Sequence, residues 1–218
     1  EYSYYAIKTF GKYKRPIVVT EHSSAVNRDK LGKEIYTMGK VTYTSADKVI
    51  CVSKPLAEKI EKNFKVKPEI IPNIVDSGVF NFVNRKTGNP VFTFIAVANL
   101  IPSKRIDFLV TVFVRIAKKY QNARLTIIGD GTEKNKITKL IGKYDLQSRI
   151  CMAGNIKREK IKEYLEDSDC FVLPSQTETF GVSYIEAMAT GLPVIATKCG
   201  GPEDFVNESN GILIEVDS

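Results

Sequence analysis

The sequence predicts an α/β protein in which short parallel strands alternate with helices. From Val91 onward, short segments rich in Val, Ile, Leu and Phe alternate with amphipathic segments of helical length. Apolar runs of this kind are typical of strands that are buried on both faces of a parallel sheet. Their alternation with helices is the pattern of repeated βα units, which place helices on both faces of one sheet. The sequence therefore predicts a doubly wound domain after Val91.

Six strands are expected in this part, at residues 91–97, 124–128, 150–153, 170–173, 194–196 and 211–214. Helices are expected between them at residues 106–119, 133–144, 158–166 and 183–190. The last helix is closed by Gly191 and followed by Pro193, two residue types that end helices. Ligands of doubly wound sheets bind at the carboxyl ends of the strands, where the strand order reverses. We therefore expect a single crevice formed by the loops that follow the strands.

The residues before Val91 predict a smaller set of elements. Helices are expected at residues 2–14, 28–45 and 55–63, and strands at residues 17–20, 48–52 and 69–71. Three strands do not close a domain of their own. The polar stretch 84–90, which contains Gly88 and Pro90, is the expected linker between this part and the next.

Composition places the chain among ordinary soluble globular proteins. It has 218 residues, of which 43% are hydrophobic and 26% charged. No apolar run reaches twenty residues, so neither a transmembrane helix nor a signal peptide is expected within it. The four cysteines form no C-x-x-C pair, which predicts reduced and buried thiols in a cytosolic protein: Cys51, Cys151, Cys170 and Cys199.

The positive charge favours anionic partners. The formal charge is +7 and the pI is about 9.1, which suits nucleic acid, acidic lipid or a phosphorylated substrate. Because the chain has no helix-turn-helix, zinc-finger or RNP-type pattern, no nucleic-acid partner is expected. Lysines cluster at residues 8–15 and 54–67. They form either solvated helix faces or a surface for peripheral contact with an anionic membrane, and both alternatives stay open.

The segment from Glu178 to Pro193 is the most informative for function. Glu178 is expected in the loop after the strand 170–173, and Glu186, separated from it by seven residues, inside the next helix. Gly181 just before that helix allows close backbone approach to a ligand, and the first N–H groups of a helix attract anions. An anionic ligand with hydroxyls on both sides would be held at three points. A sugar nucleotide has this layout of sugar, diphosphate and ribose.

This spacing resembles the E-x7-E signature of retaining glycosyltransferases of family 4. Six further segments, in the order in which that family has them, extend the resemblance over nearly the whole chain: Thr20-Glu21-His22, and residues 46–53, 71–73, 99–104, 128–131 and 200–203. The resemblance implies the GT-B fold with two Rossmann-like doubly wound domains, the first of them incomplete.

The resemblance also implies a division of the chain and of the full enzyme. Residues 1–88 would form the second half of the amino-terminal, acceptor-side domain and the linker, and residues 89–218 the carboxyl-terminal domain that binds the nucleotide sugar. Because the chain has no initiator Met and stops where relatives continue into closing helices, we expect a fragment. Such a fragment should bind the donor weakly and transfer no sugar.

For the phosphates of the donor, the resemblance points to Lys104, which lies in the loop after the strand 91–97. Relatives often carry Gly-Arg-Leu where this chain has Ala98-Asn99-Leu100, so an arginine that commonly shares the phosphate is missing. Arg105 is the candidate substitute, with a side chain pointing to solvent as the alternative.

The two glutamates are implied to bind the two sugars of the donor. Glu178 would accept hydrogen bonds from hydroxyls of the transferred sugar. Glu186 would accept hydrogen bonds from both ribose hydroxyls, a role that needs an ionised carboxylate. The alternative for Glu186 is a surface glutamate beside Tyr184. Further donor contacts are implied for backbone groups and for the base-binding position: Phe180, Gly181 and Val182, and Asn155 and Ile156.

His22, the one histidine of the chain, is implied to face the reacting sugar carbon and the phosphate, beside Glu178 and Lys104. Gly129, Gly131 and Asn73 are expected to be structural. The chemistry implied is front-face displacement with retention, in which the departing phosphate oxygen takes the proton of the acceptor. GT-B enzymes generally need no bound divalent ion, so the resemblance implies no metal or other cofactor.

The sequence therefore predicts a glycosyltransferase that moves a hexose from a UDP- or GDP-sugar to a glycan or lipid-linked acceptor. Its expected role is synthesis of cell-envelope polysaccharide or glycolipid, in the cytoplasm or at the inner face of the membrane. Two alternatives stay open. One is a sugar-nucleotide epimerase on the same fold, and the other a non-catalytic module that binds nucleotide sugars.

Overall fold

The computed structural model describes residues 2–11, 15–28, 30–84 and 90–216. Contacts within the chain divide it into two compact units. The first comprises the described residues of Glu1–Asn73 with Thr177–Gly181 and Gly200–Phe205, and the second Ile74–Gln176, Val182–Cys199 and the described part of Val206–Ser218. The domain boundary expected after residue 88 and most of the expected linker lie outside the described residues, so that division stays a prediction.

The second unit contains a six-stranded parallel sheet. Its strands are β4 (Phe92–Val97), β5 (Ala123–Ile128), β6 (Ile150–Gly154), β7 (Cys170–Leu173), β8 (Val194–Thr197) and β9 (Gly211–Ile214). Their order in the sheet is β6-β5-β4-β7-β8-β9, and every neighbouring pair is parallel. The chain thus begins in the middle, winds outward to β6 and returns to β7 beside β4. This is the doubly wound order, and it confirms the predicted fold class.

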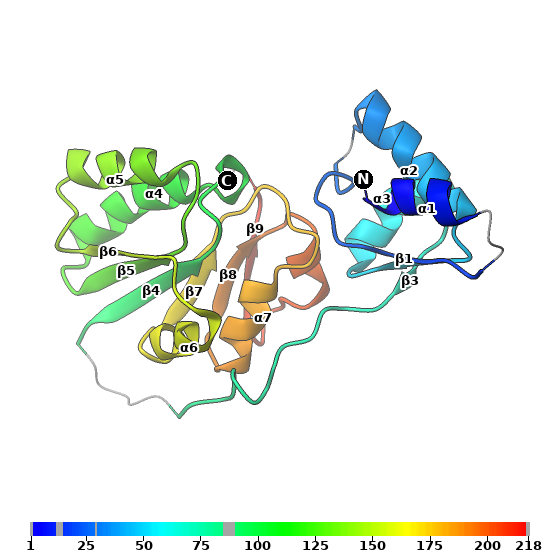
Figure 1. Ribbon diagram of the computed structural model, residues 1–218. Coiled ribbons are helices and arrows are strands. Elements are labelled where there is room, and N and C mark those ends of the chain that lie inside the picture. Colours follow the sequence, from blue (N-terminus) through cyan, green and yellow to red (C-terminus); the bar gives the residue numbers. More distant parts are fainter. Residues whose placement is uncertain (1, 12–14, 29, 85–89, 217–218) are drawn as a thin grey trace. The chain divides into compact units, whose positions relative to one another are not determined.

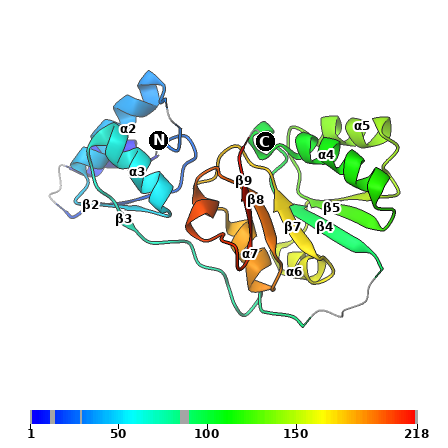
Figure 2. The same ribbon diagram turned by 180° about the vertical axis from the view of Figure 1, so that it is seen from behind.

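Helices cover both faces of this sheet (Figures 1 and 2). The helices α4 (Ile106–Lys119) and α5 (Lys134–Lys143) lie on one face, and α6 (Arg158–Glu166) and α7 (Val182–Ala189) on the other. In α4 the buried residues recur at helical spacing and form one apolar stripe against the sheet: Ile106, Leu109, Val110, Phe113 and Ala117. The strands supply the matching apolar layer, in which Ile95 and Ala96 of β4 are fully buried.

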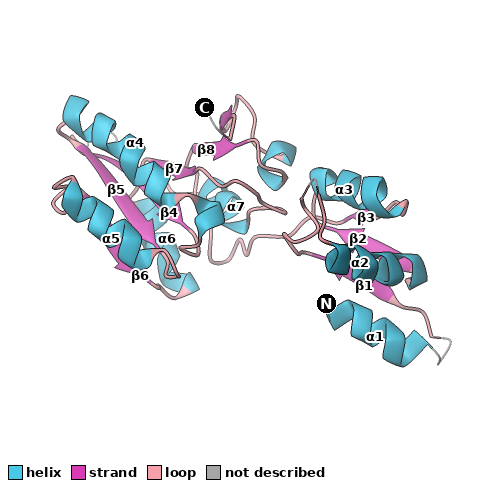
Figure 3. Cartoon of the chain, turned by 90° about the horizontal axis from the view of Figure 1, so that it is seen from above, coloured by secondary structure: helices cyan, strands magenta, loops and turns pink. Residues whose placement is uncertain are grey.

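The first unit contains a three-stranded parallel sheet of β1 (Val18–Glu21), β2 (Lys48–Cys51) and β3 (Glu69–Ile70), in that order. Three helices lie beside this sheet, namely α1 (Tyr2–Phe10), α2 (Lys33–Ser45) and α3 (Lys54–Phe64) (Figure 3). Along the chain, α2 connects β1 to β2 and α3 connects β2 to β3. The rings of Tyr36 and Tyr43 of α2 pack on Phe64 at the end of α3. Ile60 and Leu56 of α3 are fully buried.

Three expectations for local structure need correction. The helix expected to begin at residue 28 begins at Lys33, because residues 24–26 form a turn and Gly32 enters the helix from extended backbone. The helix expected to reach residue 14 ends at Phe10, although residues 12–14 lie outside the described part. Cys151 is exposed on β6 at the edge of the sheet, whereas Cys51, Cys170 and Cys199 are buried as expected, and all four are free thiols.

The helices of both units are too short or too polar to cross a membrane. No helix in the described ranges combines the length and the apolar character that such a crossing requires.

Candidate functional site

The loops that follow β4 and β7 meet at the carboxyl edge of the six-stranded sheet. β4 and β7 are hydrogen-bonded neighbours, with Phe94 opposite Cys170. Beyond each of them the loop turns over the edge, and the Gln176 N–H donates to the Ser103 carbonyl at 2.7 Å. This is the point where the strand order reverses, and ligands of such sheets bind there. The predicted crevice therefore has its scaffold in the second unit.

Lys104 lies in the first of these loops, as the sequence predicted. It is the last residue of a short 3-10 helix, η2 (Pro102–Lys104), and it is half-buried. Arg105 follows in a left-handed conformation with φ of 52°. Its guanidinium donates to the Val216 carbonyl and lies 4.4 Å from the Phe108 ring centroid. The side chain thus rests against the protein, and its donor contact stays a prediction.

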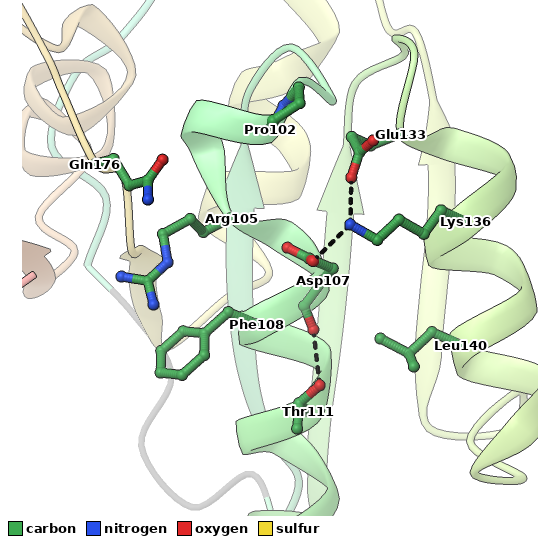
Figure 4. A pocket seen from close by; sticks show the side chains of 9 residues that line it. All are labelled: Pro102, Arg105, Asp107, Phe108, Thr111, Glu133, Lys136, Leu140 and Gln176. Atoms are coloured by element: carbon green, nitrogen blue, oxygen red, sulfur yellow. Dashed lines mark hydrogen bonds and ion pairs between the residues drawn. The ribbon is translucent and has the colours of Figure 1, made fainter. Parts of the chain in front are cut away.

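A pocket of about 550 Å³ opens beside this loop (Figure 4). It is lined by Pro102, Arg105, Asp107, Phe108, Thr111, Glu133, Lys136, Leu140 and Gln176. Lys136 Nζ bridges Asp107 at 2.8 Å and Glu133 at 2.7 Å. Burial would raise the pKa of Asp107, but the hydrogen bonds from Lys136 and the Phe108 N–H outweigh it and hold that pKa below its usual value. This side of the pocket is an ion-pair network, and the opposite side carries Arg105.

Glu186 is a buried carboxylate on α7. Its side chain is 8% exposed, and it pairs with Arg158, the first residue of α6. Burial raises the pKa of Glu186, and the hydrogen bond and charge of Arg158 oppose that rise. Tyr184, two residues earlier, is fully buried and donates its hydroxyl to the Leu173 carbonyl at 2.8 Å. The alternative of a surface glutamate beside Tyr184 is therefore wrong.

Glu178 lies in the segment of the β7–α7 loop that belongs to the first unit. It is buried, and it forms an isolated parallel bridge with Gly200. The carbonyl of Glu178 accepts from Asn27 Nδ2 at 2.7 Å and from the Gly201 N–H at 3.0 Å. These contacts hold the backbone of the loop, and the sequence had not singled out Asn27.

Phe180 and Gly181 complete that loop. The Phe180 ring packs on Phe205 at 5.4 Å between centroids. Gly181 has φ of 96°, which side chains rarely adopt. The close approach of a ligand to this glycine stays a prediction. Val182 then begins α7, one residue earlier than expected.

His22 follows β1 directly and is exposed, as expected of a polar residue at a strand end. Beside it, the Glu21 carboxylate accepts from the Tyr43 hydroxyl and from the Ser23 N–H. Asn155 and Ile156 follow β6, the first exposed and the second half-buried. The roles proposed for His22, Asn155 and Ile156 stay predictions.

The predicted residues divide between the two units. His22, Glu178, Phe180 and Gly181 belong to the first unit, and Lys104, Arg105, Asn155, Ile156, Val182 and Glu186 to the second. Arg158 could not be recognised from the sequence, because 28 positions separate it from Glu186 and only the packing of α6 near α7 joins them. Across the part of the chain that is described, no group of three or more His, Cys, Asp or Glu side chains has a metal-binding arrangement.

Comparison with known proteins gives two family matches in succession. The model of "Glycosyltransferase Family 4" matches residues 2–79, and that of "Glycosyl transferases group 1" matches residues 80–218. The chain is 26% identical to a phosphatidylinositol N-acetylglucosaminyltransferase protein of Arabidopsis thaliana, and the match covers 92% of this chain and 46% of that protein. It is 33% identical to "Uncharacterized glycosyltransferase MJ1059" of Methanocaldococcus jannaschii, with 82% and 46% covered.

Among solved structures, the chain is similar to a TarM mutant of S. aureus in complex with fondaparinux, alpha-GlcNAc-glycerol and UDP. The TM-score is 0.79 at 26% identity, and the match covers 92% of this chain and 41% of TarM. The chain thus spans less than half the length of each of these three proteins.

Proposed function

Because this chain belongs to the group 1 glycosyl transferases of family 4 and has their GT-B fold, we propose that it serves a retaining transfer from a nucleotide-diphosphate sugar. The acceptor is a glycan or a lipid-linked acceptor. The observation that carries the proposal is the switch point, where the loops after β4 and β7 meet. These loops present Lys104 for the diphosphate, and α7, which follows the second loop, carries the buried Glu186 for the ribose.

UDP is the first nucleotide to test, because the similar TarM structure contains UDP. GDP is the second. The A. thaliana relative is named for a phosphatidylinositol acceptor, which favours a lipid-linked acceptor for this protein as well. A net charge of +7 suits work at an anionic lipid surface, in synthesis of glycolipid or envelope polysaccharide.

The proposed chemistry breaks the bond between the anomeric carbon and the phosphate oxygen and forms a bond from that carbon to an acceptor oxygen on the same face. The acceptor proton passes to the departing phosphate oxygen. Lys104 and the N–H groups at the start of α7 stabilise the charge that develops on the diphosphate, which is typically worth several kcal/mol. Glu178 holds the transferred sugar, and His22 orients the reacting groups. No metal ion takes part.

Nucleotide binding tests the site. Calorimetry with UDP and GDP in the presence of a chelator should detect binding by the chain. Glu186→Ala should weaken nucleotide binding by roughly ten- to more than a hundredfold, or about 1.5–3 kcal/mol, because a charged hydrogen-bond partner is lost. Glu178→Ala should instead weaken discrimination between UDP-sugars. Glu163→Ala, which removes an exposed glutamate from α6, is the matched control.

The outcomes separate the alternatives. Binding that appears only when magnesium is added would contradict the metal-free proposal, and unchanged binding in both glutamate variants would show that the site is misplaced. In a protein of the length of its relatives that contains this chain, a labelled donor and a membrane lipid extract should give a glycoside with the donor's anomeric configuration. A free epimer as product would favour the epimerase, and binding without turnover the non-catalytic module.

A further inference from the structure

Arg158 contacts one oxygen of the Glu186 carboxylate, Oε1. Its Nη2 lies 2.7 Å and its Nε 2.9 Å from the same carboxylate atom, Oε1. The contact from Nε is a charge-assisted hydrogen bond and that from Nη2 an ion pair, so both hold Oε1 beside the guanidinium. Oε2 is not used by Arg158. A ribose hydroxyl that approached this carboxylate would meet an acceptor already fixed in space.

The Arg158 guanidinium also contacts an aromatic ring. Arg158 Cζ lies 5.7 Å from the centroid of the Phe80 ring, within the range of a cation–π contact. Phe80 is 1% exposed, so its ring is fixed by the packing around it and supports the Arg158 side chain. The Arg158 side chain is 55% exposed and the Glu186 side chain 8% exposed. The cation therefore sits at the surface above a buried anion.

Arg158 is the charged residue that acts on the Glu186 carboxylate. Glu186 is the charged residue of α7, and β8, against which α7 packs, has the uncharged sequence Val-Ile-Ala-Thr. On β7, which contacts α7 through Phe171 and Tyr184, the titratable group is Cys170, whose Sγ lies 3.6 Å from the Phe171 carbonyl oxygen. In the turn that ends at Phe80, the Asp76 carboxylate accepts from the Gly78 N–H. Arg158 is thus the counter-charge of Glu186.

We propose that Arg158 is a positioning residue of the nucleotide site, which fixes Glu186 through Oε1 so that Oε2 receives the ribose. This inference rests on the proposed function, since it assigns Glu186 to the ribose. A buried carboxylate without a cation takes up a proton instead of staying charged. A guanidinium stays protonated at every accessible pH. Arg158 therefore keeps Glu186 in the state that accepts from two hydroxyls.

The test is the pH dependence of UDP affinity. Arg158→Met, Arg158→Lys and the control Arg115→Met, which removes an exposed arginine from α4, are compared with the parent by calorimetry between pH 5.5 and 8. The ratio of variant to parent affinity is used because the titration of the phosphate itself cancels in it. Loss of the guanidinium should raise the pKa of Glu186 further, so Arg158→Met should lose affinity as pH falls.

At the low end of the range Arg158→Met should bind up to roughly tenfold more weakly than the parent, because more of its Glu186 is protonated there. At pH 8, where the ionised form of Glu186 is favoured, the loss of affinity in Arg158→Met should be smaller. Arg158→Lys, which keeps a cation beside Glu186, should bind more like the parent than Arg158→Met does throughout the range. In a Glu186→Gln background, Arg158→Met should have no further effect, because the group that it controls no longer titrates.

A uniform loss of affinity at every pH, present also in the Glu186→Gln background, would overturn the inference and assign Arg158 a merely structural role or direct contact with the nucleotide. The carboxyl titration of Glu186, followed by carbon NMR without nucleotide, should move upward in Arg158→Met, and an unmoved titration would overturn the inference as well. If the parent binds neither UDP nor GDP, the proposed function fails first. If the parent binds nucleotide and the ratio of Arg158→Met affinity to parent affinity does not change with pH, the inference about Arg158 is wrong and the proposed function stands.

Discussion

At the scale of single residues, Gly129 shows why the site tolerates little change. Gly129 follows β5 with φ of 141°, and its N–H donates to the Gly154 carbonyl at 2.8 Å. A Cβ atom placed there would lie 1.8 Å from the carbonyl oxygen of Ala98, which begins the loop of Lys104. The expectation that Gly129 is structural is thus confirmed, because its missing side chain lets the loops after β4 and β5 touch.

We expect Gly129→Ala to destabilise the second unit by at least about 3 kcal/mol, since both the backbone strain and the clash oppose folding. Urea unfolding followed by circular dichroism measures it. Gly142→Ala is the control, because Gly142 lies in α5 and the nearest atom to its added Cβ is 3.8 Å away. The control should gain about 0.5 kcal/mol from helix propensity. Equal effects of the two substitutions would contradict the close approach.

Cys170 links a single thiol to alkaline stability. Burial and the neighbouring Asp169 raise the pKa of Cys170 from 9.0 to about 11. Above pH 9 the unfolded chain ionises this thiol while the folded chain does not. The contribution of the neutral Cys170 thiol to the free energy of unfolding is therefore fully present below pH 9. It falls by about 2 kcal/mol as the pH rises from 9 to 11.

We expect Cys170→Ala to abolish this part of the alkaline loss. The difference in unfolding free energy between parent and variant, measured under reducing conditions, should shrink from pH 8 to 11. Cys151→Ala, which removes the exposed thiol of β6, is the control for loss of one cysteine. A difference for Cys170→Ala that is constant over this range would contradict the assignment.

At the scale of elements, α3 ends on a residue in an unfavourable conformation. Lys65 has φ of 59° and donates its N–H to the Glu61 carbonyl at 3.0 Å, the geometry of a left-handed helix end. Glycine is the residue that adopts this conformation without cost. The Lys65 side chain is exposed, so its removal disturbs no packing.

We expect Lys65→Gly to stabilise the first unit by about 0.5–1 kcal/mol, because a non-glycine residue costs about 1–2 kcal/mol there and glycine loses some of this in chain entropy. Lys62→Gly, one turn earlier in the same helix, should destabilise by about 1 kcal/mol. Thermal unfolding of the two variants should therefore shift in opposite directions. Two shifts of the same sign would show that the end of α3 is not strained.

The ends of several helices could be predicted from the sequence, and the start of α2 could not. The ends of α4 were predicted at Ile106 and Lys119 because five buried residues recur at helical spacing. The start of α2 was missed because Gly32 caps it without a side-chain hydrogen bond, so no capping residue marks the position.

The candidate site, too, could be predicted only in part from the sequence. Motif spacing placed Glu178 in the loop after β7 and Glu186 on the next helix, since both positions are local to one βα unit. The pairing of Glu186 with Arg158 depends on two helices that approach each other only in the folded sheet. Local sequence carries no signal for that approach, and the same holds for the hydrogen bond of Asn27 to the loop of Glu178.

At the scale of the whole molecule, the two units have separate sheets and separate cores. We expect differential scanning calorimetry to resolve two transitions, because each core is cooperative by itself. Lys65→Gly should move one of them and Gly129→Ala the other. One transition that shifts with both substitutions would show that the two sheets unfold as a single cooperative body.

The pairing of β4 with β7 also bears on how the protein is made. In the folded sheet one edge of β4 pairs with β7, with Phe94 opposite Cys170. β7 is synthesised only after β5, β6 and the helices α4, α5 and α6, so this edge of β4 waits for its partner. Translation at roughly 5–20 residues per second leaves this edge open for several seconds. An unpaired apolar strand edge is a template for association with other chains. A ribosome stalled before residue 170 thus displays a half-sheet in which one edge of β4 is open, and the loop that carries Glu178 has not yet been made.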